Sequence, residues 1–315
     1  ADNYDKSLKQ ADKINELLEE YKTPEIALEY TKALFNATCD TDNFDERLKQ
    51  ANKIKALQEE YKTPEIALAY AKALVNATCD TDNFDEIVKQ ADKINELLKY
   101  YKPPEIALEY AKALTNVTCD TDNFDEIVKQ ADKINELLKY YKTPEIALKY
   151  AQALFNATCV TDNFDESLKQ GNKINELLKY YKTPEIALVY ALALGNVSNK
   201  ADNYEQSLKQ ANKINELLKY YKTPEIALEY AKALVNATFD TDNFDKSLEQ
   251  ADKINKLLKE YKTLEIALAY ARSLVNTANI SNNRNIITSY KIKIYNLYQE
   301  YKTLEFAECY AMILA

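Results

Sequence analysis

Residues 121–160 read TDNFDEIVKQADKINELLKYYKTPEIALKYAQALFNATCV, and this stretch recurs with a period of 40 residues from Ala1 to the last residue. Seven complete copies and one copy of 35 residues fill the chain of 315 residues. A fixed period of this length is typical of stacked units, each of which contacts its neighbours. We therefore expect one elongated repeat array over residues 1–315. The expected units are residues 1–40, 41–80, 81–120, 121–160, 161–200, 201–240, 241–280 and 281–315.

The first half of each repeat predicts a long helix. Between Phe124 and Tyr141, apolar residues recur at steps of three, one and three. This spacing marks one face of a helix of about 18 residues. Asn123 stands three residues before Glu126, which is the spacing of a capping box at a helix start.

The second half predicts a shorter helix. Thr143 is a suitable N-cap, and Pro144 suits the first helical position, where a missing N–H group is harmless. The residues from Asn156 to Asp162 are expected to form the return loop. Each repeat is thus predicted to be an αα-hairpin, and the fold class is an all-α solenoid of eight stacked helix-turn-helix repeats.

Composition argues against several functional classes. The net charge of −9 argues against nucleic acid, whose phosphates need clustered Lys and Arg. No apolar run approaches the roughly 18 to 20 residues of a transmembrane helix, so membrane insertion is not expected. The chain has no His, the commonest general base, and no Gly-rich phosphate loop. We therefore expect no enzyme and no cofactor.

Two features suggest a metal site, and both have a simpler explanation. Cys39, Cys79, Cys119 and Cys159 share one repeat position, but later copies place Asn or Phe there, and Phe cannot bind a metal. The acidic loop at residues 39–46 lacks the Gly and the distal Glu of a calcium loop. Helix capping and compensation of the helix dipole account for its carboxylates. No metal site is expected.

Two repeat positions hold tyrosine in every copy, and in residues 121–160 these tyrosines are Tyr141 and Tyr150. Both lie on predicted apolar faces, where a ring packs and its hydroxyl reaches a neighbouring loop. We therefore expect both sets of tyrosines in the core.

The second helix resembles that of tetratricopeptide repeats. In residues 24–34, PEIALEYTKAL, the aromatic Tyr30 precedes the small Ala33 by three positions, and Leu34 follows. The similarity covers half of every repeat. The period differs from the family's 34 or so residues, the Trp-Leu-Gly pattern is absent, and Ile26 replaces a small residue. The resemblance implies a scaffold that binds peptides or proteins, without catalysis.

Departures from the repeat indicate candidate partner sites. The second helix varies most at three positions, which in residues 161–200 are Val189, Leu192 and Gly195. Variable positions are expected on the exposed surface, so an apolar stripe there is either a partner site or tolerated drift. Tyr is favoured at interfaces. Exposed aromatic side chains are expected at Tyr100, Tyr140, Tyr180 and Tyr220.

Asn-x-Ser/Thr sequons recur along the chain. Six of them occupy one repeat position, so they count as one duplicated event. The position is predicted at a helix end beside a loop, where exposure would permit N-glycosylation of a secreted chain. Polar termination of the helix is the alternative. The candidate asparagines are Asn36, Asn76, Asn116, Asn156, Asn196, Asn236 and Asn279.

The last repeat departs from the others toward apolar residues. Soluble solenoids need polar terminal caps, and the first repeat looks like an internal unit. Two uncapped, non-identical ends could stack head to tail and build fibres. A truncated chain, or self-burial of the last helix, is the alternative. The residues expected at such a contact are Ile292, Tyr295, Tyr298, Met312, Ile313 and Leu314.

The sequence therefore predicts a non-enzymatic, tetratricopeptide-like scaffold that mediates protein–protein interaction with a protein or peptide partner. The alternative is a self-assembling, glycosylated extracellular or cell-surface filament subunit. The sequence leaves the compartment open.

Overall fold

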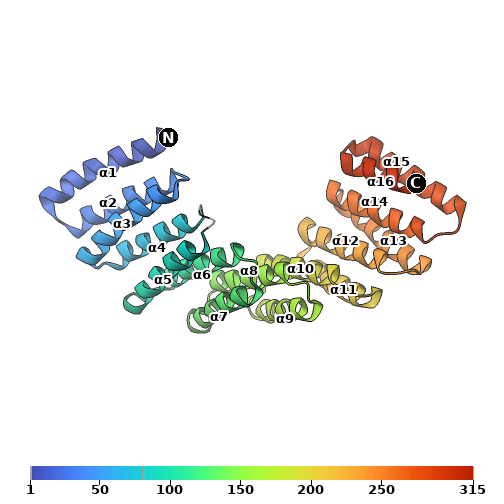
Figure 1. Ribbon diagram of the computed structural model, residues 1–315, viewed down its shortest axis with the longest axis horizontal. Helices are drawn as coiled ribbons and strands as arrows, with labels where there is room; N and C mark the ends of the chain where they lie inside the picture. Colours follow the sequence, from blue (N-terminus) through green and yellow to red (C-terminus); the bar gives the residue numbers. More distant parts are fainter. Residues whose placement is uncertain (1, 80, 82, 315) are drawn as a thin grey trace. The chain divides into compact units, whose positions relative to one another are not determined.

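The computed structural model describes residues 2–79, 81 and 83–314 (Figure 1). The regular structure within these residues is entirely helical, and each repeat forms one helical hairpin. The predicted all-α solenoid of helical hairpins is confirmed. None of the described helices is both long and apolar enough to span a membrane.

The helices form two compact units, residues 1–157 and 158–315. The first unit contains α1 (Asp2–Tyr21), α2 (Pro24–Cys39), α3 (Phe44–Tyr61), α4 (Pro64–Thr78), α5 (Phe84–Tyr100), α6 (Pro104–Cys119) and α7 (Phe124–Tyr141). The boundary lies within α8 (Pro144–Val160). The second unit contains α9 (Phe164–Tyr181), α10 (Pro184–Asn199), α11 (Tyr204–Tyr221), α12 (Pro224–Phe239), α13 (Phe244–Tyr261), α14 (Leu264–Asn279), α15 (Arg284–Tyr301) and α16 (Leu304–Leu314).

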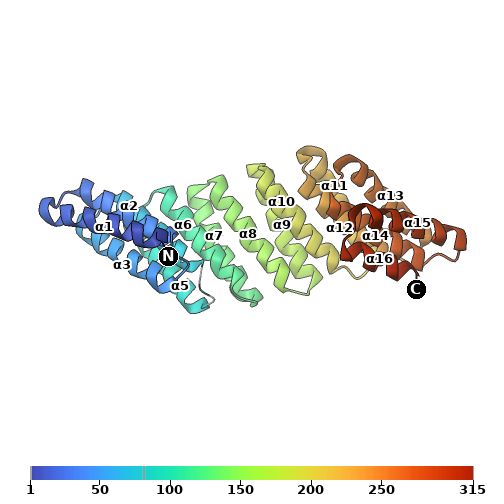
Figure 2. The same cartoon turned by 90° about the horizontal axis from the view of Figure 1, so that it is seen from above.

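Within each unit the hairpins lie side by side (Figure 2). Consecutive helices pack against each other, and second helices of neighbouring hairpins also pack together, as α4 does with α6 and α10 with α12. One continuous array over residues 1–315 stays a prediction.

The predicted capping residues start the helices. The Asn123 side chain accepts a hydrogen bond from the Glu126 N–H group at 3.1 Å. The Thr143 hydroxyl accepts one from the Ile146 N–H group at 3.3 Å. Both bonds satisfy N–H groups that lack a partner in the first turn of a helix.

Left-handed lysines end most of the first helices. Lys142, for example, has a φ of 53°. This conformation is unfavourable for a residue with a Cβ atom, by about 1 to 2 kcal/mol. It reverses the chain within two residues, so that the second helix folds back on the first. The left-handed lysines are Lys22, Lys62, Lys142, Lys182, Lys222, Lys262 and Lys302.

The core repeats from hairpin to hairpin. Ile94 and Ile134 of the first helices and Leu74 of a second helix are buried to within 1%. Full burial of such a side chain stabilises the fold by about 1.5 to 3 kcal/mol. Ala67 and Ala73 are also fully buried, and their small side chains allow the second helices to pack closely where neighbouring hairpins meet. Because each repeat supplies the same side chains, every unit has a continuous core.

The return loop begins later than predicted, so its predicted start at Asn156 is wrong. Asn156 lies inside α8, which continues to Val160, and the equivalent Asn116 lies inside α6. The Thr118 hydroxyl donates to the Thr115 carbonyl at 2.7 Å, so this polar side chain finds its hydrogen-bond partner within the helix. The polar Asn-x-Thr stretch is therefore compatible with a helix end and does not break it.

The predicted core position is right for one set of tyrosines and wrong for the other. Tyr150 is 5% exposed, and most of its equivalents are equally buried. Tyr141 is only half-buried, and Tyr21 is 60% exposed. The second set lies at the ends of the first helices, where the chain reverses and fewer neighbours cover the ring.

Candidate functional site

Four exposed tyrosines lie in the last turns of first helices. Tyr100 and Tyr140 belong to α5 and α7 of the first unit, and Tyr180 and Tyr220 to α9 and α11 of the second. Their exposed fractions are 81%, 70%, 82% and 82%, so the predicted exposure is confirmed. The same repeat position holds an exposed glutamate in the other four repeats, namely Glu20, Glu60, Glu260 and Glu300.

The apolar stripe on α10 is not an exposed surface. Val189 is 8% exposed, and Leu192 and Gly195 are half-buried. A Cβ atom on Gly195 would lie 2.8 Å from Oε2 of Glu229, which belongs to α12. The expectation of exposure is wrong for Val189, because second helices of neighbouring hairpins pack on each other and cover this stripe.

The last hairpin exposes apolar side chains. Ile292 is 56% exposed, Tyr295 43%, Met312 61% and Leu314 51%. Tyr298 is half-buried, and the Tyr295 ring lies 5.3 Å from that of Tyr310. The sixth candidate, Ile313, is 5% exposed, so its assignment to an external contact is wrong. It lies on the inner face of α16, which packs on α14 and α15.

The sequon asparagines make hydrogen bonds between neighbouring repeats. The Asn116 side-chain nitrogen donates to the Thr78 hydroxyl at 2.8 Å and to the Cys79 sulfur at 3.5 Å. Thr78 is 2% exposed and donates to the Val75 carbonyl at 2.7 Å. The same bond reaches a Thr or Ser 38 residues earlier from Asn76, Asn156, Asn196, Asn236 and Asn276.

This Asn–Thr ladder gives the Asn-x-Thr pattern a structural reason. Each Asn bonds back to one repeat, and each Thr accepts from the next. Asn276 keeps the bond although Ala278 removes its sequon. A glycan would replace one of the two hydrogens that the side-chain nitrogen donates. Among the seven candidates, Asn36 and Asn279 are exposed and the others are half-buried, and glycosylation stays a prediction for all of them.

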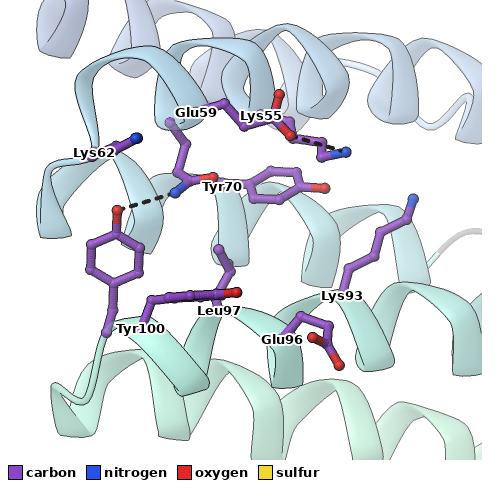
Figure 3. Close-up of a pocket in the computed structure, with 10 residues that line it drawn as sticks. Lys55, Glu59, Lys62, Tyr70, Lys93, Glu96, Leu97 and Tyr100 are labelled. Carbon is purple, nitrogen blue, oxygen red and sulfur yellow. Dashed lines mark hydrogen bonds and ion pairs between the residues drawn. The ribbon is translucent and has the colours of Figure 1, made fainter.

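A cleft of about 650 Å³ lies between α3 and α5, above Tyr70 of α4 (Figure 3). Tyr70 is 2% exposed, and its hydroxyl is buried without a hydrogen-bond partner among the described residues. Burial raises the pKa of Tyr70 to about 12. The other residues that line the cleft are Lys55, Gln58, Glu59, Lys62, Lys93, Glu96, Leu97, Tyr100 and Tyr101.

Sequence reasoning missed this cleft, apart from Tyr100. The sequence did contain evidence for the cleft, in the form of residues that differ from their equivalents in the other repeats. Lys55 stands where repeats one and three to seven have Asn, and Gln58 stands where they have Leu. Pro103 stands where every other repeat has Thr. A position-by-position comparison of the copies would have placed all three in two neighbouring hairpins.

Comparisons with known proteins add little. No family model matches the chain, and no curated protein matches it. One solved structure, described as "Computational Design of Self-Assembling Cyclic Protein Homooligomers", aligns with 99% of this chain and 92% of its own. The identity is 12% and the TM-score is 0.12, and this similarity is too low to support an argument.

Proposed function

We propose that this protein is a non-enzymatic scaffold, tetratricopeptide-like in its second helices, that mediates protein–protein interaction. Four tyrosine rings that are 70% to 82% exposed carry the proposal. Tyrosine anchors interfaces because it combines a large apolar ring with a hydroxyl that can donate or accept a hydrogen bond. Most other large apolar side chains are buried or half-buried, with exceptions such as Phe239 and Leu304, so each of these rings offers apolar area that a partner would gain by covering.

The repeat itself supplies the matched variant for a test. The variant with Tyr100→Glu, Tyr140→Glu, Tyr180→Glu and Tyr220→Glu has the glutamate that repeats one, two, seven and eight carry at the same position. The variant is therefore expected to fold, which its far-UV circular dichroism checks.

Selection of a random peptide library on the immobilised wild-type protein tests the function. We expect enriched peptides with micromolar dissociation constants and about a tenfold loss of affinity on the four-glutamate variant. A library without enrichment, or peptides that bind the variant as well as the wild type, would refute the proposal.

The last hairpin favours self-assembly as a second candidate function. Ile292 is exposed at a position that is charged or polar in all other repeats. Met312 is exposed at a position that is charged or polar in all other repeats except the fifth, which has Leu192, and Tyr295 replaces Asn or Lys. A single exposed apolar residue can arise by neutral substitution. Three changes toward exposed apolar side chains on one hairpin instead indicate a surface that another protein chain covers. Sedimentation velocity of the wild type and of Ile292→Lys with Met312→Lys should show a concentration-dependent oligomer that the variant loses. A wild type that remains monomeric at all concentrations rules this candidate out.

A further inference from the structure

Three departures from the repeat meet at the cleft between α3 and α5. Lys55 and Gln58 come from α3, and Pro103 changes the end of α5. Neutral drift would scatter such changes among eight repeats. All three changes lie at one cleft, which has the volume of a small-molecule site, and this indicates that they act together in binding a ligand.

Pro103 reshapes one wall of the cleft. A residue that precedes proline is disfavoured in helical conformations, and Lys102 alone among its equivalents has no positive φ. α5 therefore ends at Tyr100, and Tyr101 is extended, with φ −118° and ψ 121°. The Gln58 side chain donates a hydrogen bond to the Tyr101 hydroxyl at 3.1 Å. The hydrogen bond from Gln58 thus fixes the Tyr101 side chain in the position that the extended backbone before Pro103 gives it.

Tyr70 forms the floor of the cleft. Figure 3 shows its ring between the α3 side chains and the α5 side chains, with the hydroxyl directed toward the end where Lys55 and Lys93 lie. A buried hydroxyl without a partner is unfavourable, and native proteins rarely keep one. A ligand that accepts a hydrogen bond at this end would remove the cost.

The charges around the cleft favour an anion. Glu59 is paired with Lys55 at 3.3 Å, and Glu96 is paired with Lys99 at 2.6 Å. Lys93, in contrast, donates to the neutral Gln90 side chain at 2.8 Å. Burial lowers the pKa of Lys93, the nearby Lys89 ammonium lowers it further, and the Glu86 carboxylate offsets these effects only in part. An anion beside Lys93 would offset both effects.

We propose that this cleft binds a small aromatic anion, a ring that carries a carboxylate or phosphate group. The ring would lie against Tyr100 and Leu97, and the anionic group would accept hydrogen bonds from the Tyr70 hydroxyl and the Lys93 ammonium. The site goes beyond the scaffold function, shares only Tyr100 with the four exposed tyrosines, and is tested by variants that leave all four unchanged.

Isothermal titration calorimetry on the full chain tests the site with two kinds of probe. Phenylacetate and phenyl phosphate represent a free ligand, and a capped tripeptide with central phosphotyrosine represents a peptide source. We expect a dissociation constant of about 1 mM or lower for at least one probe. Tighter binding of the tripeptide, by about tenfold, would assign the ligand to a peptide, and equal or weaker binding would assign it to a free molecule.

Variants locate the binding. Tyr70→Phe removes only the hydroxyl and should weaken binding about tenfold, as should Lys93→Met. Pro103→Thr restores the residue of the other repeats and should abolish binding. Tyr110→Phe, the equivalent change one repeat later, should have no effect. The proposal is overturned if no probe binds with a dissociation constant of about 1 mM or lower, or if Tyr70→Phe, which preserves the shape of the core, binds like the wild type.

Discussion

The hydrogen bond between Asn116 and Thr78 should stabilise the contact between two neighbouring hairpins. A double-mutant cycle measures this contribution. Thr78→Val removes the hydroxyl and keeps the shape of the side chain, Asn116→Ala removes the amide, and the double variant removes both. The coupling free energy of the cycle isolates the pair from the separate effects of each change.

The structure sets the expected size. The bond is 2.8 Å long, and Thr78 is 2% exposed, so its hydroxyl cannot turn to water. Asn116 is half-buried, so its amide regains part of its hydration when the bond is lost. A neutral hydrogen bond of this kind contributes about 0.5 to 1.5 kcal/mol, and we expect a coupling of about 1 kcal/mol.

Urea unfolding followed by circular dichroism at 222 nm gives the four free energies of unfolding. The chain offers a weaker bond of the same type as a control, since Asn236 donates to the Ser198 hydroxyl at 3.5 Å. The cycle of Ser198→Ala with Asn236→Ala should show less than half of the coupling. A coupling below about 0.3 kcal/mol for Asn116 and Thr78, or equal coupling in the two pairs, would refute the reasoning.

Three further predictions concern turns and pH. Lys142→Gly should raise the free energy of unfolding by about 1 kcal/mol in urea, because φ is 53° there, whereas Lys102→Gly should not raise it. Burial raises the pKa of Tyr110 and Tyr150 from 10.0 to about 12, so the folded state holds these protons more tightly. The resulting stability is complete below pH 10 and is lost as the pH rises through 12. The difference in absorbance at 295 nm between the wild type and the variant Tyr110→Phe with Tyr150→Phe isolates these two residues and should change together with circular dichroism. A difference signal that titrates near pH 10 without unfolding would contradict this. Burial also raises the pKa of Asp240 above 3.8, so the free energy of unfolding should fall as the pH rises from below 3.8 through the raised pKa. Asp240→Asn should remove this fall, and an unchanged pH profile in the variant would count against it.

Local signals made the hairpins predictable from the sequence. The capping side chains of Asn123 and Thr143 act within three residues of their own position, and the apolar spacing from Phe124 to Tyr141 reports one helix face. None of these signals depends on how hairpins stack. Eight copies of the same pattern also remove the ambiguity that one copy would leave.

Features that depend on contacts between hairpins were not predictable in this way. Variation at Val189 suggested exposure, but the position faces a neighbouring second helix, where the repeats accept several side chains. Ile313 occupies a position of the repeat that lies on the buried face of the second helix, while its neighbour Met312 lies on the exposed face. The cleft above Tyr70 required both the position of α5 relative to α3 and the changed end of α5 at Pro103.

The Asn–Thr ladder also bears on how the length of such a chain can change. Every bond of the ladder joins residues 38 positions apart, in repeats of 40 residues. Loss or gain of 40 codons by recombination between copies would bring each Asn opposite a Thr at the same separation. A change of 39 or 41 codons would leave one Asn without its acceptor and turn a helix face away from its neighbour. The ladder therefore favours growth and contraction of the gene in whole repeats.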